Sequence, residues 1–312
     1  MTELYKRVCS LVVGNAVGSG IDLSAFRVKF SVKQSLVQTP KFADITVYNL
    51  GHETALQIQQ EFKTVELRAG YEGAVGLIFR GTVIQARIGR ESATDNYLQV
   101  IATHQDLAHN FTVTSKSIAA GWTQADRAAA IAGDFARQGV TLGSVPNFSS
   151  AQAPRGRVCF GMTRDQARQL ADANGAHWNI DDDQLQMCRI DETLPDVAVV
   201  LNSKTGMIGM PALTIDGVVV RSLLRSDIRA GQRLQIDNAS IQDPSVPPSI
   251  SYAVERSLFP TKDADGLYKV YYVSHTGDTR GQPWYTDMIA TSMASIPAFS
   301  DIYVNAVASN GS

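Results

Sequence analysis

Four apolar runs decide the fold of this chain: FADITVYNL (42–50), VELRAGYEG (65–73), GLIFRGTVIQARIGRE (76–91) and NYLQVIATH (96–104). Val, Ile, Tyr, Phe and Thr dominate these runs, while Gly, Asn and Asp separate them, which is typical of strands joined by turns. In the second run, Val65 and Leu67 alternate with charged residues. This alternation indicates an antiparallel sheet with one buried face and one exposed face.

Two further strands are predicted earlier in the chain, at residues 4–13 and 25–37. The second, AFRVKFSVKQS, alternates apolar and polar residues more regularly than any other run. The glycine-rich stretch between them, GNAVGSGIDL (14–23), lacks the Lys-Ser/Thr ending of a phosphate-binding loop and precedes a strand, so it is interpreted as a hairpin loop. With a short helix at 51–62, residues 1–105 predict an antiparallel β-barrel.

The same pattern returns near the end of the chain. At an offset of 188 residues, IGRESATDNYLQVIATH (88–104) aligns with TGDTRGQPWYTDMIATS (276–292), so that Gly89 falls on Gly277 and Tyr97 on Tyr285. Either this is a chance similarity of short segments, or residues 206–312 form a second β-module that superimposes on the first. The second module would carry a proline-rich excursion at 237–266, and the tail after Pro297 is expected to fray.

Residues 106–205 have a different character and predict a small α/β domain. One helix is expected to begin at Thr123, with Asp126 completing a capping box, and a second at Thr163, with Gln166 in the same role. The stretch AHWNIDDDQLQMCR (176–189) predicts a hairpin that turns through its three aspartates. The expected fold class is therefore α+β, mainly β, in three parts: 1–105, 106–205 and 206–312.

The composition is that of a folded globular protein. The chain has 312 residues, of which 44% are hydrophobic and 19% charged, with a formal net charge of −2. This balance excludes a disordered chain and a global basic field that would draw it to nucleic acid or anionic membranes. No apolar run is long enough to span a membrane, and CSLVVG near the start is too short for a signal peptide. Three scattered cysteines indicate synthesis in a reducing cytosol.

Three groups of polar residues are candidates for a chemical site. His177 with Asp181–Asp183 fits either a metal site or a turn rich in aspartate. His104, Gln105 and Asp106, with His109 nearby, fit either a catalytic strand end or a polar domain junction. The loop that contains Asp278, Arg280 and Trp284 fits either a ligand site or an interface turn.

For each group, the structural interpretation is favoured over the chemical one. The chain contains no GxSxG or HExxH motif, and its cysteines lack the CxxC spacing of a zinc site. The sequence therefore predicts no catalytic, cofactor-binding or metal-binding residue, and a protein that is not an enzyme.

The two β-modules resemble a known family. ITVYNL (45–50), KTVELRAGYEG (63–73) and GLIFRGTV (76–83) look like the first barrel of baseplate hub proteins of contractile-tailed phages and tailocins. A later set is similar to the second barrel of those hubs: VVVRSLL (218–224), RAGQRLQI (229–236) and YKVYYVSHTGDTRGQPWYTDMIA (268–290). The resemblance extends more loosely to the helix-and-hairpin part between them. None of these motifs is catalytic.

The resemblance implies a virion structural protein in the tail baseplate, assembled in the host cytoplasm. Two tail-tube-like barrels per chain imply a homotrimer whose six barrels match a hexameric tail tube on one side and a trimeric spike on the other. Implied partners are the tail tube protein, the central spike protein, other baseplate proteins and the tape measure protein, with DNA only in transit through the lumen. Larger hubs carry an appended lysozyme domain, and because this sequence is short, cell-wall cleavage by this chain is not expected.

Two alternatives stay open at this stage. One is a tail-tip cell-wall or glycan hydrolase that uses Asp181–Asp183 or Asp278, and the other is a glycan-binding module with Trp284 at its site. If the ring exists, barrel edges should pair within and between chains, because exposed edges invite aggregation. Lys29 and Lys33 are then expected to lie away from the channel or to be paired with carboxylates, since free lysines would hold passing phosphates.

Overall fold

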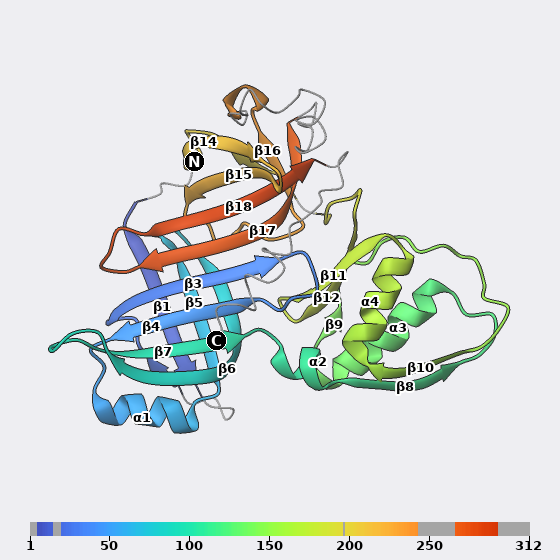
Figure 1. The fold of residues 1–312 in the computed structure, drawn as a ribbon, viewed down its shortest axis with the longest axis horizontal. Coiled ribbons are helices and arrows are strands. Elements are labelled where there is room, and N and C mark those ends of the chain that lie inside the picture. Colours follow the sequence, from blue (N-terminus) through green and yellow to red (C-terminus); the bar gives the residue numbers. More distant parts are fainter. Residues whose placement is uncertain (1–4, 15–19, 196, 243–265, 293–312) are drawn as a thin grey trace, which may run out of the picture.

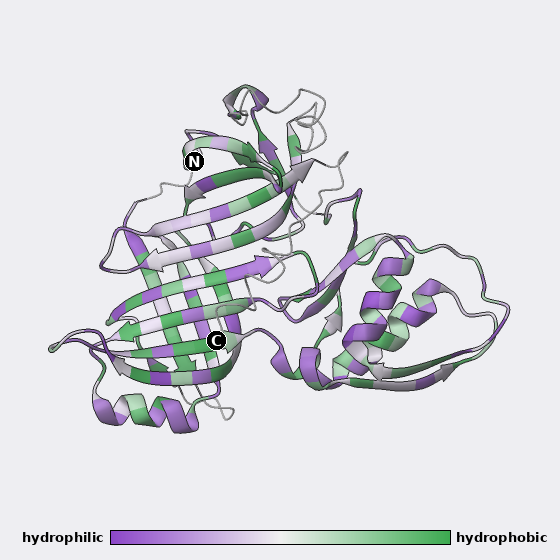
Figure 2. Cartoon of the chain, in the orientation of Figure 1, coloured by the Kyte–Doolittle hydropathy of each residue, from purple (hydrophilic) through white to green (hydrophobic). Residues whose placement is uncertain are grey.

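The computed structural model describes residues 5–14, 20–195, 197–242 and 266–292 (Figure 1). Its fold is mainly β, with a large sheet to which a smaller helical part is attached. Along the strands of this sheet, hydrophilic and hydrophobic residues alternate (Figure 2). The elements fall into three groups, which we call the first β-module, the middle part and the second β-module.

The first β-module is a sheet that folds over itself. Its elements are β1 (Arg7–Gly14), β2 (Gly20–Asp22), β3 (Arg27–Ser35), β4 (Phe42–Tyr48), α1 (His52–Glu61), β5 (Thr64–Tyr71), β6 (Ala74–Arg90) and β7 (Asn96–Thr103). The strand order is β3-β4-β7-β6-β5-β1-β2, and β1 and β5 cross behind β3, β4 and β7 (Figure 1). Phe30, Ile45, Leu67 and Phe79 fill the core between these layers, and Ile58 of α1 packs against it.

The middle part contains three α-helices and two small sheets. Its elements are α2 (Asp106–Phe111), β8 (Val113–Ile118), α3 (Gln124–Phe135), η1 (Ala136–Gln138), β9 (Thr141–Leu142), β10 (Arg157–Met162), α4 (Thr163–Ala173), β11 (Ala176–Asp181) and β12 (Gln184–Arg189). β8 pairs with β10, and β12 lies between β11 and β9. Phe135, Leu170 and Trp178 lie in its own core.

The two predicted helix caps have different outcomes. At α3, Thr123 and Asp126 form the expected capping box. At α4 the prediction is wrong, because Met162 occupies the cap position and Thr163 is the first helical residue. The Thr163 hydroxyl is buried and shares a hydrogen bond of 2.9 Å with the Thr114 hydroxyl of β8. The Thr163 hydroxyl therefore bonds a residue that is distant in the sequence instead of capping its own helix.

The second β-module contains β13 (Val199–Leu201), β14 (Met207–Thr214), β15 (Gly217–Leu223), β16 (Arg233–Ile236), η2 (Asn238–Ser240), β17 (Leu267–Asp278) and β18 (Trp284–Ser292). The strand order is β14-β15-β18-β17, with β16 beside β17 and β13 parallel to β16. Because β13 pairs with β16, we propose that the boundary predicted at residue 205 lies before Val199. Most of the predicted proline-rich excursion, and all of the tail after Pro297, fall outside the described residues.

The strand registers of the two modules coincide. Ala86 pairs with Val100 in the first module, and Val273 pairs with Met288 in the second. Each long strand also has a register shift at the equivalent place, after Val83 in β6 and after Val270 in β17.

Tyr97 and Tyr285 therefore lie in equivalent strands, β7 and β18, as predicted. The expected match of Gly89 with Gly277 is wrong by one residue, since Gly89 pairs with Tyr97 while Thr276 pairs with Tyr285. The loop that follows is one residue longer in the second module, so the offset changes inside that loop.

The two modules share one continuous 13-stranded sheet. Residues 272–278 of β17 pair antiparallel with residues 29–35 of β3, so the edge of one module joins the edge of the other (Figure 1). Each strand thereby satisfies backbone groups that would otherwise be exposed on an edge. We call this contact the module seam.

Candidate functional site

Two junctions hold most of the polar residues that are candidates from the sequence. The first is the tip of the β11–β12 hairpin, which projects from the middle part toward both β-modules. The second is the loop between β17 and β18, which lies on the first β-module at the end of the module seam. Their geometry decides between the chemical and the structural interpretations of these residues.

The hairpin tip is a two-residue turn. Asp182 and Asp183 have φ values of 46° and 60°, and these left-handed conformations at both central positions suit a tight hairpin. Aspartate tolerates this backbone better than most residues. The three consecutive aspartates are therefore fixed at the point of the middle part that meets the rest of the chain.

Each aspartate has a different partner. Asp181 Oδ1 lies 3.5 Å from Lys41 Nζ of the first β-module. Asp182 forms an ion pair with Arg229 of the second β-module. Asp183 accepts a hydrogen bond of 2.5 Å from Gln105 Nε2, in the segment that enters the middle part. The tip thus connects all three parts of the chain.

The Asp181 carboxylate is ionised although it is buried. Only 3% of its side chain is exposed. Burial alone would raise the pKa of Asp181, but the charges of Lys41 and Arg229 outweigh it and hold this pKa below the usual range. Within the described residues, no group of three or more His, Cys, Asp or Glu residues is arranged to hold a metal.

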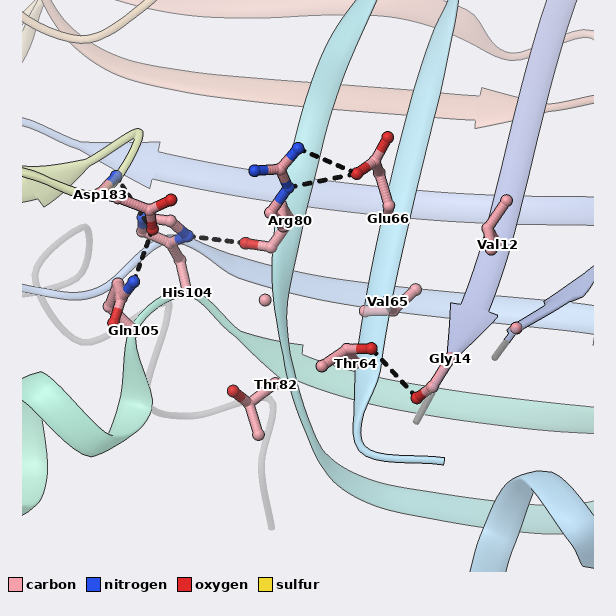
Figure 3. A pocket seen from close by; sticks show the side chains of 12 residues that line it. Val12, Gly14, Thr64, Val65, Glu66, Arg80, Thr82, His104, Gln105 and Asp183 are labelled. Carbon is pink, nitrogen blue, oxygen red and sulfur yellow. Dashed lines mark hydrogen bonds and ion pairs between the residues drawn. The ribbon is translucent and has the colours of Figure 1, made fainter. Parts of the chain in front are cut away.

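His104 has both ring nitrogens engaged. Its Nδ1 lies 2.6 Å from the carbonyl oxygen of Arg80, and the Asp183 backbone N–H donates to Nε2 over 3.3 Å (Figure 3). In this arrangement Nδ1 donates to the carbonyl oxygen of Arg80 and Nε2 accepts. His104 therefore anchors the hairpin tip to β6, and its basic nitrogen is already occupied.

A cavity of about 680 Å³ lies beside His104, between the hairpin tip and strands β5 and β6 (Figure 3). Two carboxylates line it, Asp183, which accepts from Gln105, and Glu66. Glu66 receives a hydrogen bond of 2.7 Å from Arg68 and pairs with Arg80 at 3.1 Å. The hydrogen bond from Arg68 holds the pKa of Glu66 below its usual range. A glycosidase acid needs a raised pKa, so Glu66 does not suit that role.

His275 lies buried near the hairpin tip. It is 2% exposed, and its Nδ1 lies 3.0 Å from the Thr286 hydroxyl. That hydroxyl oxygen accepts from the Arg225 N–H, so its own proton is directed to Nδ1. Burial, followed by the charge of Lys41, lowers the pKa of His275 to about 3.

The other two candidate histidines pack against aromatic rings. His177 meets Tyr271 edge to face at 5.7 Å, apart from the aspartates with which it was grouped. His109 stacks on Trp178 at 6.0 Å, and its Nε2 lies 2.9 Å from the carbonyl oxygen of Gln38.

The loop after β17 is held by two arginines of the first β-module. Arg27 binds Asp278 through two hydrogen bonds, of 2.7 Å from Nη2 and 3.2 Å from Nε. Arg7 donates to the carbonyl oxygens of Gly281 and Gln282 over 2.7 and 3.0 Å. Asp278 is thus committed to a charge-assisted contact between the modules.

Trp284 completes this contact from inside. Its side chain is 1% exposed, and it meets Phe30 in a T-shaped contact with ring centroids 5.5 Å apart. Its Nε1 donates to the carbonyl oxygen of Gly70 over 3.3 Å. The interpretation of Trp284 as a glycan-stacking residue is therefore wrong, because its faces are covered by the first β-module.

The basic partners at these junctions carry no signal in the sequence. No polar cluster in the sequence contains Lys41, Arg229, Arg7 or Arg27. Each meets an aspartate or carbonyl group from a distant part of the chain. The signals in the sequence were the acidic turn, the strand end at His104 and Gln105, and the loop rich in Asp, Arg and Trp.

The fold is that of phage-tail proteins. Over 92% of its length the chain resembles a tail protein from Neisseria meningitidis MC58, with a TM-score of 0.55, 11% identity and 96% of that chain covered. The 43 kDa tail protein of prophage MuSo2 from Shewanella oneidensis gives a TM-score of 0.51 at 10% identity, with 92% of this chain and 99% of that one covered. An E. coli type VI secretion component, described as similar to T4 tail proteins gp27 and gp5, gives 0.50 at 12% identity, covering 92% and 77%.

The sequence itself identifies the family of the chain. Residues 42–259 match the family described as baseplate hub gp41, and the chain belongs to that family. It is thus a structural protein of the phage tail and a component of the virion. No curated protein matches the sequence. Among the described helices, none combines the length and apolar character that crossing a membrane requires.

The buried ion pair gives a first prediction. Lys41→Met should lower the free energy of unfolding by about 3 kcal/mol, because it leaves the buried Asp181 carboxylate without its nearest counter-charge. Lys29→Met is the matched control: Lys29 is exposed and has no ion pair among the described residues, so its change should stay within about 0.5 kcal/mol. Urea unfolding measures both, and equal effects would contradict the assignment.

His275 gives a second prediction, on pH. The unfolded chain takes up a proton at this histidine below about pH 6.5, whereas the folded chain does so only near its pKa of about 3. Stability should therefore fall as the pH is lowered through this window. His275→Gln should lose about 2 kcal/mol less than the wild type between about pH 7 and pH 4.5. Urea unfolding at both pH values measures this, and His52→Gln, at an exposed position, should behave as the wild type does.

Proposed function

We propose that three copies of this chain form a ring in the baseplate hub, which joins a hexameric tail tube to a trimeric spike. The observation that carries the proposal is the module seam between two β-modules of matching register. A chain with two equivalent modules presents two similar units to its surroundings. Three such chains around a threefold axis present six, as contact with a sixfold tube requires.

The ring would surround the channel through which DNA passes. The face of the shared sheet opposite the core carries small polar residues, among them Ser31, Thr46 and Thr276, which offer a hydrated surface. Lys29 and Lys33 lie on this face as well, and neither forms an ion pair with the described residues. The sequence predicts that these lysines lie away from the channel or are paired with carboxylates. That prediction is untested, and a channel lined by this face would contradict it.

The proposed role is mechanical and conductive, without a reaction. Supporting it, Asp181, Asp182 and Asp278 are bound to Lys41, Arg229 and Arg27. A glycoside hydrolase needs a carboxylic acid and a second carboxylate free to act at the same bond. We further propose that the chain is assembled in the host cytoplasm with the tail tube protein, the spike, other baseplate proteins and the tape measure protein, and that it contacts DNA only in transit.

The symmetry of the hub layer tests the ring. Cryo-electron microscopy of the tail should show three chains around the axis, with the six β-modules at nearly sixfold positions. The hub layer should have a mass of three chains. Twofold order, or six separate copies of this chain in one layer, would reject the proposal.

The proposal of no reaction has its own test. In a peptidoglycan zymogram the purified chain should give no clearing, and Asp182→Asn and Asp278→Asn should be indistinguishable from it. Clearing by the wild type that either substitution abolishes would establish the hydrolase instead. A lysozyme run in the same gel controls for the substrate.

A further inference from the structure

Two arginines of the middle part converge on one neutral oxygen. Arg127 belongs to α3, Arg157 is the first residue of β10, and α4 packs against both of these elements (Figure 1). The Gln169 side chain of α4 reaches both arginines. Its Oε1 accepts a hydrogen bond of 3.4 Å from Arg127 Nη2 and one of 3.2 Å from Arg157 Nη2. Two positive charges thus share an acceptor that carries no charge.

Arg127 is buried without a counter-charge. It is 2% exposed, and among the described residues it forms no ion pair. Besides the contact with Gln169, its Nη2 donates to the Gln166 carbonyl oxygen over 3.2 Å, and its Nε is buried with no partner in the part of the chain that the structure describes. Burial, followed by the charge of Arg157, lowers the pKa of Arg127. Arginine is almost never fully buried unless an anion pairs with it.

Arg157 is held beside Arg127 by an aromatic ring. Its guanidinium lies over the Trp122 ring, 5.9 Å from the ring centroid, and Trp122 Nε1 donates to the Arg155 carbonyl oxygen over 3.0 Å. The Nε of Arg157 is also buried and has no hydrogen-bond partner among the described atoms. A planar guanidinium that is already held in place loses little conformational freedom when it binds an oxyanion.

The acidic side chains in the first turns of the same two helices have other partners. The Asp126 carboxylate of α3 accepts from the backbone N–H and the hydroxyl of Thr123. The Asp165 carboxylate of α4 lies 3.4 Å from Arg168. Neither of them compensates the arginine pair, so the missing negative charge has to come from outside the chain.

We propose that Arg127 and Arg157 form a binding site for a doubly charged oxyanion of the phosphate class, which takes the place of Gln169 Oε1. Gln169 is exposed, so its side chain can turn outward and admit the anion. A phosphate group carries about −1.5 to −2 charges near pH 7, which matches two arginines, whereas a carboxylate compensates one. Each guanidinium offers paired N–H groups that suit phosphate oxygens. The bound anion links α3 to β10, and this site does not depend on the proposed ring.

Calorimetric titration of the full-length chain with sodium phosphate tests the site. We expect one phosphate bound per chain. Sodium acetate at equal ionic strength should bind at least about tenfold more weakly, because a singly charged anion leaves one arginine without its charge-assisted hydrogen bonds. The absence of phosphate binding, or equal affinity for the two anions, would overturn the proposal.

Gln169→Glu is the sharpest variant, because it changes an exposed residue and keeps both arginines. Its carboxylate supplies negative charge at the position that the phosphate would occupy. The affinity for phosphate should fall at least about tenfold, and in phosphate-free buffer the variant should unfold at a higher temperature than the wild type. An unchanged affinity would contradict the assignment.

A pair of arginine variants completes the test. Arg157→Gln removes one guanidinium and should weaken phosphate binding about tenfold or more. Arg137→Gln is the matched control, since Arg137 follows the same helix, is exposed, and pairs with Asp134. It should keep the affinity of the wild type. Equal losses in the two variants would show a general attraction to surface charge and overturn the site. Far-UV circular dichroism verifies that each variant is folded.

Discussion

The antiparallel pairing of β17 with β3 is the contact on which the rest of the structure depends. It joins two sheets of similar register into one, and it uses the backbone groups of two edges that would otherwise be free. The side chains around it reinforce the same geometry. Trp284 extends the core of the first β-module into the seam, and the Arg27–Asp278 pair closes its end. Because backbone hydrogen bonds set the register, the relative position of the modules is defined residue by residue.

The middle part is positioned by charge. The turn that carries Asp181–Asp183 directs each carboxylate to a group from a different place in the sequence, so the hairpin fits in one orientation. Buried ion pairs contribute little net stability once desolvation is counted, but a misplaced one is costly. The role we infer for Lys41 and Asp181 is therefore specificity of docking. The polar cluster that resembles a site in the sequence serves as a joint between three parts of the chain.

In the ring that we propose, the hub acts through continuity of structure. The chain belongs to a family of baseplate hubs, and its shared sheet supplies two units that lie edge to edge. Such a protein needs rigid junctions and edges that accept a defined neighbour. It has no need for a titratable group poised between two protonation states. The pKa values of Asp181 and Asp278 are held low by paired arginine or lysine, which agrees with that role.

The sequence by itself determined the elements that depend on local patterns. Alternation of apolar residues placed β3, β5 and β7 within a few residues of their bounds, the repeat identified the equivalent strands, and Thr123 marked the start of α3. These signals are readable because each depends on residues that are near neighbours in the chain.

Only the tertiary structure decided which edges and charges meet. Residues 29–35 and 272–278, or Lys41 and Asp181, lie far apart in the sequence, and no periodicity encodes their pairing. The same reason explains two wrong predictions. Thr163 was expected to cap its own helix but bonds Thr114, which lies far away in the sequence. Gly277 was expected to match Gly89, but a loop longer by one residue shifts it out of register. Trp284, which the sequence left between a ligand and an interface, became a core residue because the first β-module covers it.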